Sequence, residues 1–214
     1  MLNRALTWTG LVLGSLGLVV QFIISMQAYA DLGRDIPGSL GMFFSYYTIL
    51  TNIILVLIYA SEVTPVRWLD LFRKPLVRGM MAANMMLVML FVYFVLRHLS
   101  VLEGLSLICD FILHYATPVL YMIWWCLVAL HGALRLKNLP LMLAPTFVYF
   151  LYAMARGAWV QEYPYPILNA IRLGYGQVLI NAVAMTIGLG VLMGLVIGLD
   201  YWLARRPATT TTSA

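Results

Sequence analysis

The chain has 214 residues, of which 63% are hydrophobic and only 10% carry a charge. Soluble domains carry roughly 25% charged residues, so this composition excludes an ordinary soluble domain and predicts an integral membrane protein. The formal net charge of +5 does not require a nucleic-acid partner, because membrane proteins concentrate Lys and Arg in their cytoplasmic loops. We therefore expect membrane lipids, and no nucleic acid, among the partners of this chain.

Six apolar segments follow one another along the chain. A helix needs ~20 mostly apolar residues to cross the ~30 Å hydrocarbon core of a bilayer. The predicted spans cover residues 6–30, 40–60, 79–96, 106–130, 140–156 and 176–203. This pattern predicts an all-α, polytopic fold with a single six-helix transmembrane domain over residues 1–206. The tail at residues 207–214 is mostly threonine and is predicted to be disordered.

The first span allows a second interpretation. Asn3-Arg4 precedes an apolar run that ends at Ala28-Tyr29-Ala30, as in a secretory signal with a small-residue cleavage site. The apolar core of such a signal is usually ~7–15 residues long, and this run is far longer. We therefore interpret residues 6–30 as a span that the protein retains.

Positive charge is unevenly divided between the two sides of the predicted spans. One side holds nine Lys and Arg residues and the other side holds four. The nine are Arg4, Arg67, Arg73, Lys74, Arg78, Arg135, Lys137, Arg205 and Arg206, and the four are Arg34, Arg97, Arg156 and Arg172. Because cytoplasmic loops carry the excess of Lys and Arg, both termini are predicted to be cytoplasmic.

The fourth span contains an ionisable pair, Asp110 and His114, in an otherwise apolar run. Residues four apart share a helix face, so the carboxylate can hold and orient the imidazole. Ionisable side chains inside a membrane are costly and usually mark a functional site. Pro118 cannot donate a backbone hydrogen bond to the His114 carbonyl, so we expect a kink that opens space beside the histidine. The three histidines are scattered and no metal motif is present, so neither a metal nor another cofactor is predicted.

The second span carries a polar stripe at a matching depth. At ~100° per residue, Ser45, Thr48 and Asn52 fall on one helix face. With the predicted orientation, this stripe and the Asp110–His114 pair both lie in the outer half of the membrane, because a helix rises ~1.5 Å per residue. Such hydroxyl and amide groups also bind helices together or bond their own backbone. The stripe is therefore either a structural contact between helices or part of a site.

The loop between the fifth and sixth spans reaches the same layer. It runs from Arg156 to Gly176 and contains Glu162 and the segment Tyr163-Pro164-Tyr165-Pro166. Amphipathic Tyr and rigid Pro suit either an interfacial turn or a lid over the polar layer, in which Arg156 or Arg172 pairs with a carboxylate. Asn181, just inside the predicted sixth span, is a further polar candidate.

Several of these segments together resemble a known family. Residues 43–52, His114-Tyr115-Ala116-Thr117-Pro118, and the segment from Tyr163-Pro164-Tyr165-Pro166 through Gly174-Tyr175-Gly176 resemble the androgen-induced and androgen-regulated group of polytopic membrane proteins and their bacterial relatives. The likeness covers most of the chain in span order and spacing, although each motif is short. The resemblance implies hydrolysis of fatty acid esters of hydroxy fatty acids by a threonine nucleophile and an essential histidine. It also suggests the inner (plasma) membrane of a bacterium as the location.

Transferred to this chain, the resemblance assigns the essential histidine to His114. An alignment on the aromatic start of the second span puts Ser45 at the threonine position, and a shift by one helical turn selects Thr48 instead. Because Ser45 departs from the family's threonine, the nucleophile stays open between the two residues. The resemblance assigns no role to Asp110.

These features lead to two hypotheses about function. In the first, the protein is an intramembrane hydrolase of lipid esters, in which His114 activates the hydroxyl of Ser45 or Thr48 and Asp110 orients the ring. Asn52, Asn181 and Arg156 are candidates for binding the substrate or its oxyanion. In the second, the protein binds or transports a lipid or small molecule without catalysis, and the Asp110–His114 pair is a polar or proton-linked site. A purely structural role for the pair is a third option.

Overall fold

The computed structural model describes residues 1–98 and 102–205, and within them the chain is all helical. The α-helices are α1 (Leu2–Asp31), α2 (Ile36–Phe43), α3 (Tyr47–Val63), α4 (Asp70–Arg73), α5 (Pro75–Phe91), α6 (Gly104–Phe111), α7 (Thr117–Val128), α8 (Leu139–Val160) and α9 (Ala170–Ala204). Two π-helical turns, η2 (Val92–Leu96) and η3 (Ile112–Ala116), continue α5 and join α6 to α7. The 3₁₀ turns are η1 (Arg67–Leu69), η4 (Leu136–Asn138) and η5 (Pro166–Leu168). Arg206 and the predicted disordered tail at 207–214 lie outside the described residues.

Five helical segments are each long and apolar enough to cross a membrane. They cover Leu2–Asp31, Pro75–Leu96, Gly104–Val128, Leu136–Val160 and Ala170–Ala204. A further pair, α2 and α3, is long and apolar enough only when the two helices are taken together. The chain therefore has the helical content of a polytopic membrane protein, as its composition predicts.

The prediction of one continuous helix over residues 40–60 is wrong. The chain breaks between α2 and α3 and bends there by 73°. Side chains satisfy the polar backbone at the break, because the Ser45 hydroxyl donates to the Met42 carbonyl and the Tyr149 hydroxyl donates to the Ser45 carbonyl. An unwound segment at membrane depth is tolerated where protein groups satisfy it in this way. The break puts Ser45 before the first turn of α3, which begins at Tyr47.

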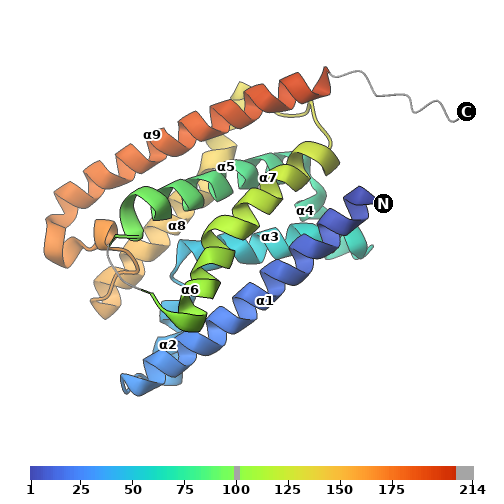
Figure 1. Cartoon of the computed structure of the whole chain (residues 1–214). Helices are drawn as coiled ribbons and strands as arrows, with labels where there is room; N and C mark the ends of the chain where they lie inside the picture. The colour runs from blue at the N-terminus through green and yellow to red at the C-terminus, as the bar shows by residue number, and fades with distance from the viewer. Residues whose placement is uncertain (99–101, 206–214) are drawn as a thin grey trace, which may run out of the picture.

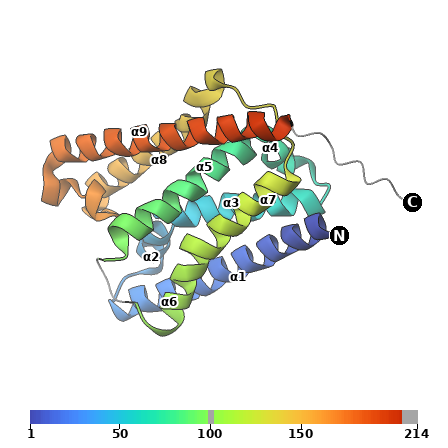
Figure 2. The same ribbon diagram turned by 45° about the horizontal axis from the view of Figure 1, so that its top comes forward.

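The helices form one bundle in which segments distant in sequence lie side by side (Figure 1). Helix α1 packs against α3 and α7, while α5 packs against α7 and α9, and α8 lies along α9. The start of α1 and the end of α9 lie at the same end of the bundle, and α2 and α6 lie at the opposite end (Figures 1 and 2).

Aromatic side chains fill the centre of the bundle between α1, α3 and α7. Tyr121 stacks on Trp124 with ring centroids 5.5 Å apart, and Tyr59 meets Trp124 edge to face at 5.3 Å. All three are fully buried. Gly10 lets α1 approach this cluster closely, because a Cβ atom at Gly10 would lie 2.2 Å from the Tyr59 ring. The core thus fixes the position of α3 relative to α7, and with it the relative positions of the polar residues on these two helices.

Candidate functional site

Thr48 and His114 face each other near the end of the bundle that holds α2 and α6. The Thr48 Oγ1 atom lies 3.2 Å from Nε2 of His114. On the other side of the ring, Nδ1 of His114 lies 2.8 Å from the Asp110 Oδ1 atom and forms a hydrogen bond with the Asp110 backbone carbonyl at 3.1 Å. Both of these oxygens are acceptors, so they favour the tautomer with its proton on Nδ1, which leaves Nε2 free to accept a proton from a hydroxyl. The three side chains therefore have the connectivity of a hydroxyl–imidazole–carboxylate triad.

Each member of this triad is largely withdrawn from solvent. Thr48 is 7% exposed, and the side chains of His114 and Asp110 are 18% and 25% exposed. The contact between Asp110 and His114 agrees with their four-residue spacing. The contact between Thr48 on α3 and His114 on η3 depends instead on how the helices pack in the tertiary fold.

The helix that carries His114 has a π-helical turn at this point. In η3, the Thr117 amide donates to the Ile112 carbonyl, one residue further back than in an α-helix. The Leu113 carbonyl then accepts from Nδ2 of Asn52 at 3.2 Å and from the Thr117 hydroxyl at 3.3 Å. Single π-turns inside α-helices often occur at functional sites. The helix is thus irregular just before Pro118, as a π-turn, while the kink that the proline predicts stays a prediction.

Asn52 fastens the two helices that carry the triad. Its Nδ2 atom also donates to the Thr48 carbonyl at 2.9 Å, and its Oδ1 atom accepts from the Thr117 hydroxyl at 2.8 Å. Asn52 is fully buried, with both ends of its amide occupied. It positions Thr48 relative to His114 and has no free donor for a substrate oxyanion. Thr117 was not among the candidates predicted from the sequence. Its position directly before Pro118 and three residues after His114 is the signal that could have identified it.

Thr48 occupies the second position of α3, where helix amides have no helical acceptor. Its amide instead donates to the Tyr165 hydroxyl oxygen, at 3.4 Å. The Tyr165 ring meets Tyr46 and Phe91 edge to face, with centroids 5.7 and 6.2 Å away. The loop before α9 thus reaches over the first turn of α3.

Thr48 also lies in the wall of an apolar cavity of about 220 Å³ between α3, α5, α8 and α9. Most of its other lining side chains are aliphatic or aromatic, such as Phe91, Leu143 and Leu189. Phe147 on α8 and Leu179 on α9 line the cavity and are also 60% and 59% exposed. The cavity therefore extends from Thr48, the one member of the triad that lines it, to the outer apolar surface between α8 and α9.

The structure does not bring the other predicted site residues to the triad. The Ser45 hydroxyl is fully buried and donates to the Met42 carbonyl at 2.6 Å. Asn181 donates to the Ile167 carbonyl at 2.9 Å and accepts from Gln177 at 3.0 Å. Both residues hold backbone segments together. Ser45 misses the polar stripe because the helix break changes the direction in which it points.

Arg156 belongs to an ionic cluster that holds the loop between α8 and α9. Its Nη1 atom donates to the Glu162 carbonyl at 3.2 Å, and its Nη2 atom lies 3.7 Å from the Glu162 carboxylate. Arg34, from the turn after α1, binds the same carboxylate with both Nη atoms, at 2.7 and 2.5 Å. The hydrogen bonds from Arg34 hold the pKa of Glu162 below its usual range, against a smaller opposing effect of burial. The loop that carries Tyr165 is thereby tied to the α1–α2 turn.

Comparisons of the chain with known proteins gave no match. No family model, no curated protein and no solved structure matches the chain. Within residues 1–98 and 102–205, no group of three or more His, Cys, Asp or Glu side chains is arranged to hold a metal ion. The protein is therefore characterised by its fold and site geometry: a helical, apolar bundle with a buried hydroxyl–imidazole–carboxylate arrangement beside an apolar cavity.

Proposed function

We propose that the protein is an intramembrane hydrolase of lipid esters, with Thr48 as nucleophile, His114 as general base and Asp110 as the group that orients His114. The observation that carries the proposal is the 3.2 Å separation between the Thr48 hydroxyl and Nε2 of His114, with Asp110 on the opposite ring nitrogen. Hydrogen-bond reach between nucleophile and base, and between base and orienting group, is the geometric requirement for an activated hydroxyl.

The reaction follows from the positions of these groups. The Thr48 Oγ1 atom attacks the ester carbonyl carbon while its proton passes to Nε2 of His114. When the tetrahedral intermediate collapses, the bond to the alcohol oxygen breaks and the imidazolium returns the proton to that oxygen. Water then attacks the acyl-threonine in the same manner and releases the fatty acid and the free threonine. Asp110 stabilises the imidazolium formed in each half of the reaction.

The carbonyl oxygen of the substrate gains negative charge and needs donors next to Thr48. Thr48 and Tyr165 both border the cavity, and the Thr48 amide donates to the Tyr165 hydroxyl oxygen at 3.4 Å. A substrate oxygen that enters beside them would replace Tyr165 as the acceptor of this amide and would accept the Tyr165 hydroxyl proton. The positive end of the α3 dipole adds to their effect. In this proposal they replace Asn52, Asn181 and Arg156 as oxyanion donors. Both amide protons of Asn52 bind backbone carbonyls, and Asn181 and Arg156 bind the loop before α9 and do not line the cavity.

The cavity supports a substrate with a long acyl chain. Its walls are almost entirely apolar, and its lining residues Phe147 and Leu179 are exposed on the outer surface of the bundle. A chain dissolved in the bilayer could enter between α8 and α9 without crossing water. The resemblance to the androgen-induced and androgen-regulated family points to the same substrate class, fatty acid esters.

The proposal includes six membrane crossings, with α2 and α3 together forming the second. An even number of crossings fits the position of both ends of the described chain at one end of the bundle (Figure 1). The excess of Lys and Arg at that end assigns it to the cytoplasm. The triad would then lie in the outer half of the membrane, for which we propose the bacterial inner membrane.

Labelling with a long-chain fluorophosphonate, combined with hydrolysis of a fatty acid ester, tests the proposal. Purified wild-type protein should be labelled at Thr48 and should hydrolyse the ester. Thr48→Ala and His114→Ala should lose both properties, and hydrolysis should fall by at least about 10²-fold. Ser45→Ala is the matched control, because it removes the neighbouring hydroxyl that faces away from His114. Hydrolysis that is undiminished in Thr48→Ala would reject the assignment.

The apolar cavity also fits the second hypothesis, a protein that binds or carries a lipid without cleaving it. The same labelling separates the two functions, because a carrier has no activated hydroxyl. Retention of a fatty acid ester by the purified protein, without labelling of Thr48 and without hydrolysis, would favour the carrier.

A further inference from the structure

A second, polar crevice of about 230 Å³ lies at the opposite end of the bundle from the triad. Its walls come from the first turns of α1, the end of α3 and the end of α7. Its lining residues are Asn3, Arg4, Thr7, Trp8, Glu62, Val63 and Val128. Glu62 and Thr48 are both on α3 but 14 positions apart, which corresponds to about 21 Å of helix. The crevice is therefore separate from the cavity beside Thr48.

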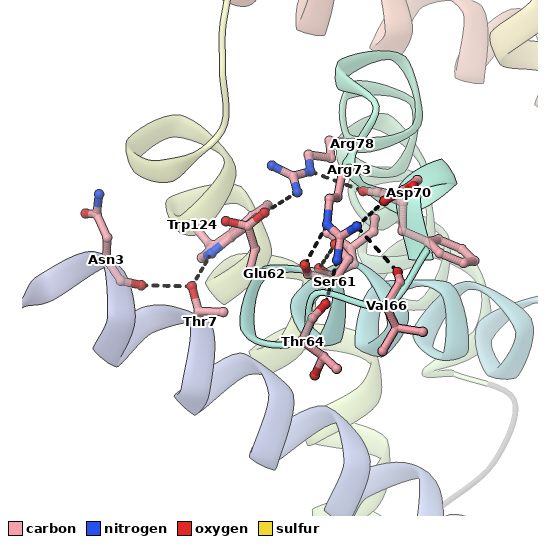
Figure 3. Close-up of polar contacts among 12 residues, drawn as sticks. Asn3, Thr7, Ser61, Glu62, Thr64, Val66, Asp70, Arg73, Arg78 and Trp124 are labelled. Atoms are coloured by element: carbon pink, nitrogen blue, oxygen red, sulfur yellow. Dashed lines mark hydrogen bonds and ion pairs between the residues drawn. The ribbon is translucent and has the colours of Figure 1, made fainter. Parts of the chain in front are cut away.

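The carboxylate in this crevice is rigidly held (Figure 3). One oxygen of Glu62 pairs with the Arg78 guanidinium. Arg78 is only 5% exposed, its Nε atom donates to the Phe72 carbonyl at 3.1 Å, and its guanidinium carbon lies 5.3 Å from the centroid of the Trp124 ring. The second oxygen of Glu62 has no hydrogen-bond partner in the described part of the chain. It is a fixed acceptor at the wall of the crevice.

The first turns of α1 are held against α7 by hydrogen bonds at the base of the crevice (Figure 3). The indole nitrogen of Trp124 donates to the Thr7 hydroxyl at 2.9 Å, and this hydroxyl donates to the Asn3 carbonyl at 2.8 Å. Thr7 and Trp124 are both buried. These bonds fix the part of α1 that carries Arg4 and Trp8.

Arg4 provides a positive charge at the mouth of the crevice. Its side chain is exposed and makes no ion pair or hydrogen bond with any residue of 1–98 or 102–205. A guanidinium group binds phosphate oxygens in a planar, two-pronged geometry. Within the described residues, the crevice thus offers the unpaired guanidinium of Arg4 to a phosphate. It also offers the free oxygen of Glu62 to a cation that can donate a hydrogen bond.

An apolar stripe on α1 continues from the crevice along the outside of the bundle. Trp8, Val12, Leu16, Val19 and Ile23 follow one helix face and are each about half exposed, from 48% to 57%. Trp commonly lies at the level of lipid head groups, with aliphatic residues deeper in the hydrocarbon. A ligand whose charged head group occupies the crevice would therefore place its hydrocarbon chains along this stripe.

We propose that the crevice binds a membrane phospholipid whose head group carries both a phosphate and a primary ammonium, as phosphatidylethanolamine does. Arg4 binds the phosphate, the free oxygen of Glu62 accepts a hydrogen bond from the ammonium, and the acyl chains lie along the stripe from Trp8 to Ile23. A phosphatidylglycerol head group lacks the cation, and the quaternary ammonium of phosphatidylcholine has no N–H to donate to Glu62.

Native mass spectrometry tests this proposal without reference to enzymatic activity. The protein is released from mixed micelles with equal amounts of phosphatidylethanolamine, phosphatidylglycerol and phosphatidylcholine. Wild type should retain phosphatidylethanolamine in preference to the other two lipids. Arg4→Gln should weaken its binding about tenfold, which is the effect of one charge-assisted hydrogen bond. Arg67→Gln is the matched control, because Arg67 is exposed at the same end of the bundle and does not line the crevice.

A second variant tests the ammonium contact. Glu62→Gln alone would leave the buried Arg78 charge unpaired, so it is combined with Arg78→Met, which removes both charges. This double variant should lose the preference for phosphatidylethanolamine over phosphatidylglycerol. Equal retention of the three lipids by wild type, or unchanged binding in Arg4→Gln, would overturn the proposal. Competition by glycerophosphoethanolamine or inorganic phosphate as effective as that by the lipid would overturn it too, because the site would then belong to a soluble phosphate compound.

Discussion

The Thr48 hydroxyl lies 3.2 Å from Nε2 of His114, although 66 positions separate the two residues in the chain. One residue lies in the first turn of α3 and the other in the π-helical turn between α6 and α7. Asn52 links these elements through the Thr48 carbonyl, the Leu113 carbonyl and the Thr117 hydroxyl. A buried amide with all these partners holds the hydroxyl and the imidazole in a fixed relation, as a preorganised site requires.

Asp110→Asn should lower kcat for ester hydrolysis by about 10²- to 10⁴-fold with little change in KM. The asparagine can turn its amide toward Nδ1 and favour the wrong tautomer of His114, and it cannot stabilise the imidazolium. Steady-state kinetics on a fatty acid ester measure the effect. Asp31→Asn is the control, because Asp31 is an exposed carboxylate near the same end of the bundle. Equal activity of Asp110→Asn and wild type would show that Asp110 has no part in the reaction.

Tyr165→Phe should reduce kcat by about 10²-fold, because one donor to the oxyanion is lost. The aromatic contacts of the ring with Tyr46 and Phe91 are preserved, so the loop should stay in place. Labelling of Thr48 by a fluorophosphonate should still occur but more slowly. Tyr163→Phe removes a neighbouring hydroxyl as the comparison. An unchanged kcat in Tyr165→Phe would exclude the Tyr165 hydroxyl and leave the Thr48 amide as the oxyanion donor.

Ala182→Phe should narrow the range of substrates, because Ala182 lines the cavity beside Thr48. Hydrolysis of long-chain esters should fall at least about tenfold, a loss of the size expected when apolar groups no longer fit a pocket. Hydrolysis of an acetate ester should be retained. Val191→Phe, at an exposed position of α9 outside the cavity, should change neither rate. If Ala182→Phe lost hydrolysis of the acetate ester as strongly as that of long-chain esters, this result would argue against a cavity that binds the acyl chain.

Acid should weaken the attachment of the loop that carries Tyr165. The pKa of Glu162 is lowered in the folded protein by its hydrogen bonds to Arg34. A group with a lowered pKa stabilises the fold above its ordinary pKa of about 4.3, and this contribution is lost as the pH falls through the lowered value. Hydrogen exchange of residues 161–169 should therefore be slow at neutral pH and should increase below about pH 4.

Glu162→Gln provides the comparison for this pH dependence. It should show the faster exchange already at neutral pH and a flatter profile, with a loss of stability of no more than about 1 kcal/mol, since the ion pair is partly exposed. The same pH profile in wild type and Glu162→Gln would assign the acid sensitivity to another group.

The amino-acid sequence by itself determined the class of the protein and one contact of the site. Low charge and apolar runs of about 20 residues indicate helices in lipid, because a helix of that length crosses the bilayer and satisfies its own backbone N–H and C=O groups. The four-residue spacing of Asp110 and His114 determines their contact, because helix geometry is local.

Only the tertiary structure decided between Ser45 and Thr48 as the partner of His114. The spacing of the polar stripe assumed a continuous helix over residues 40–60, but the chain bends by 73° before Tyr47. At the bend, Tyr149 of α8 donates to the Ser45 carbonyl from more than a hundred positions away in the chain. The contact of Tyr165 with Thr48 and the ion pair of Arg34 with Glu162 were likewise decided by the tertiary structure. Contacts between distant segments follow from how the helices pack, and they leave no periodic signal in the sequence.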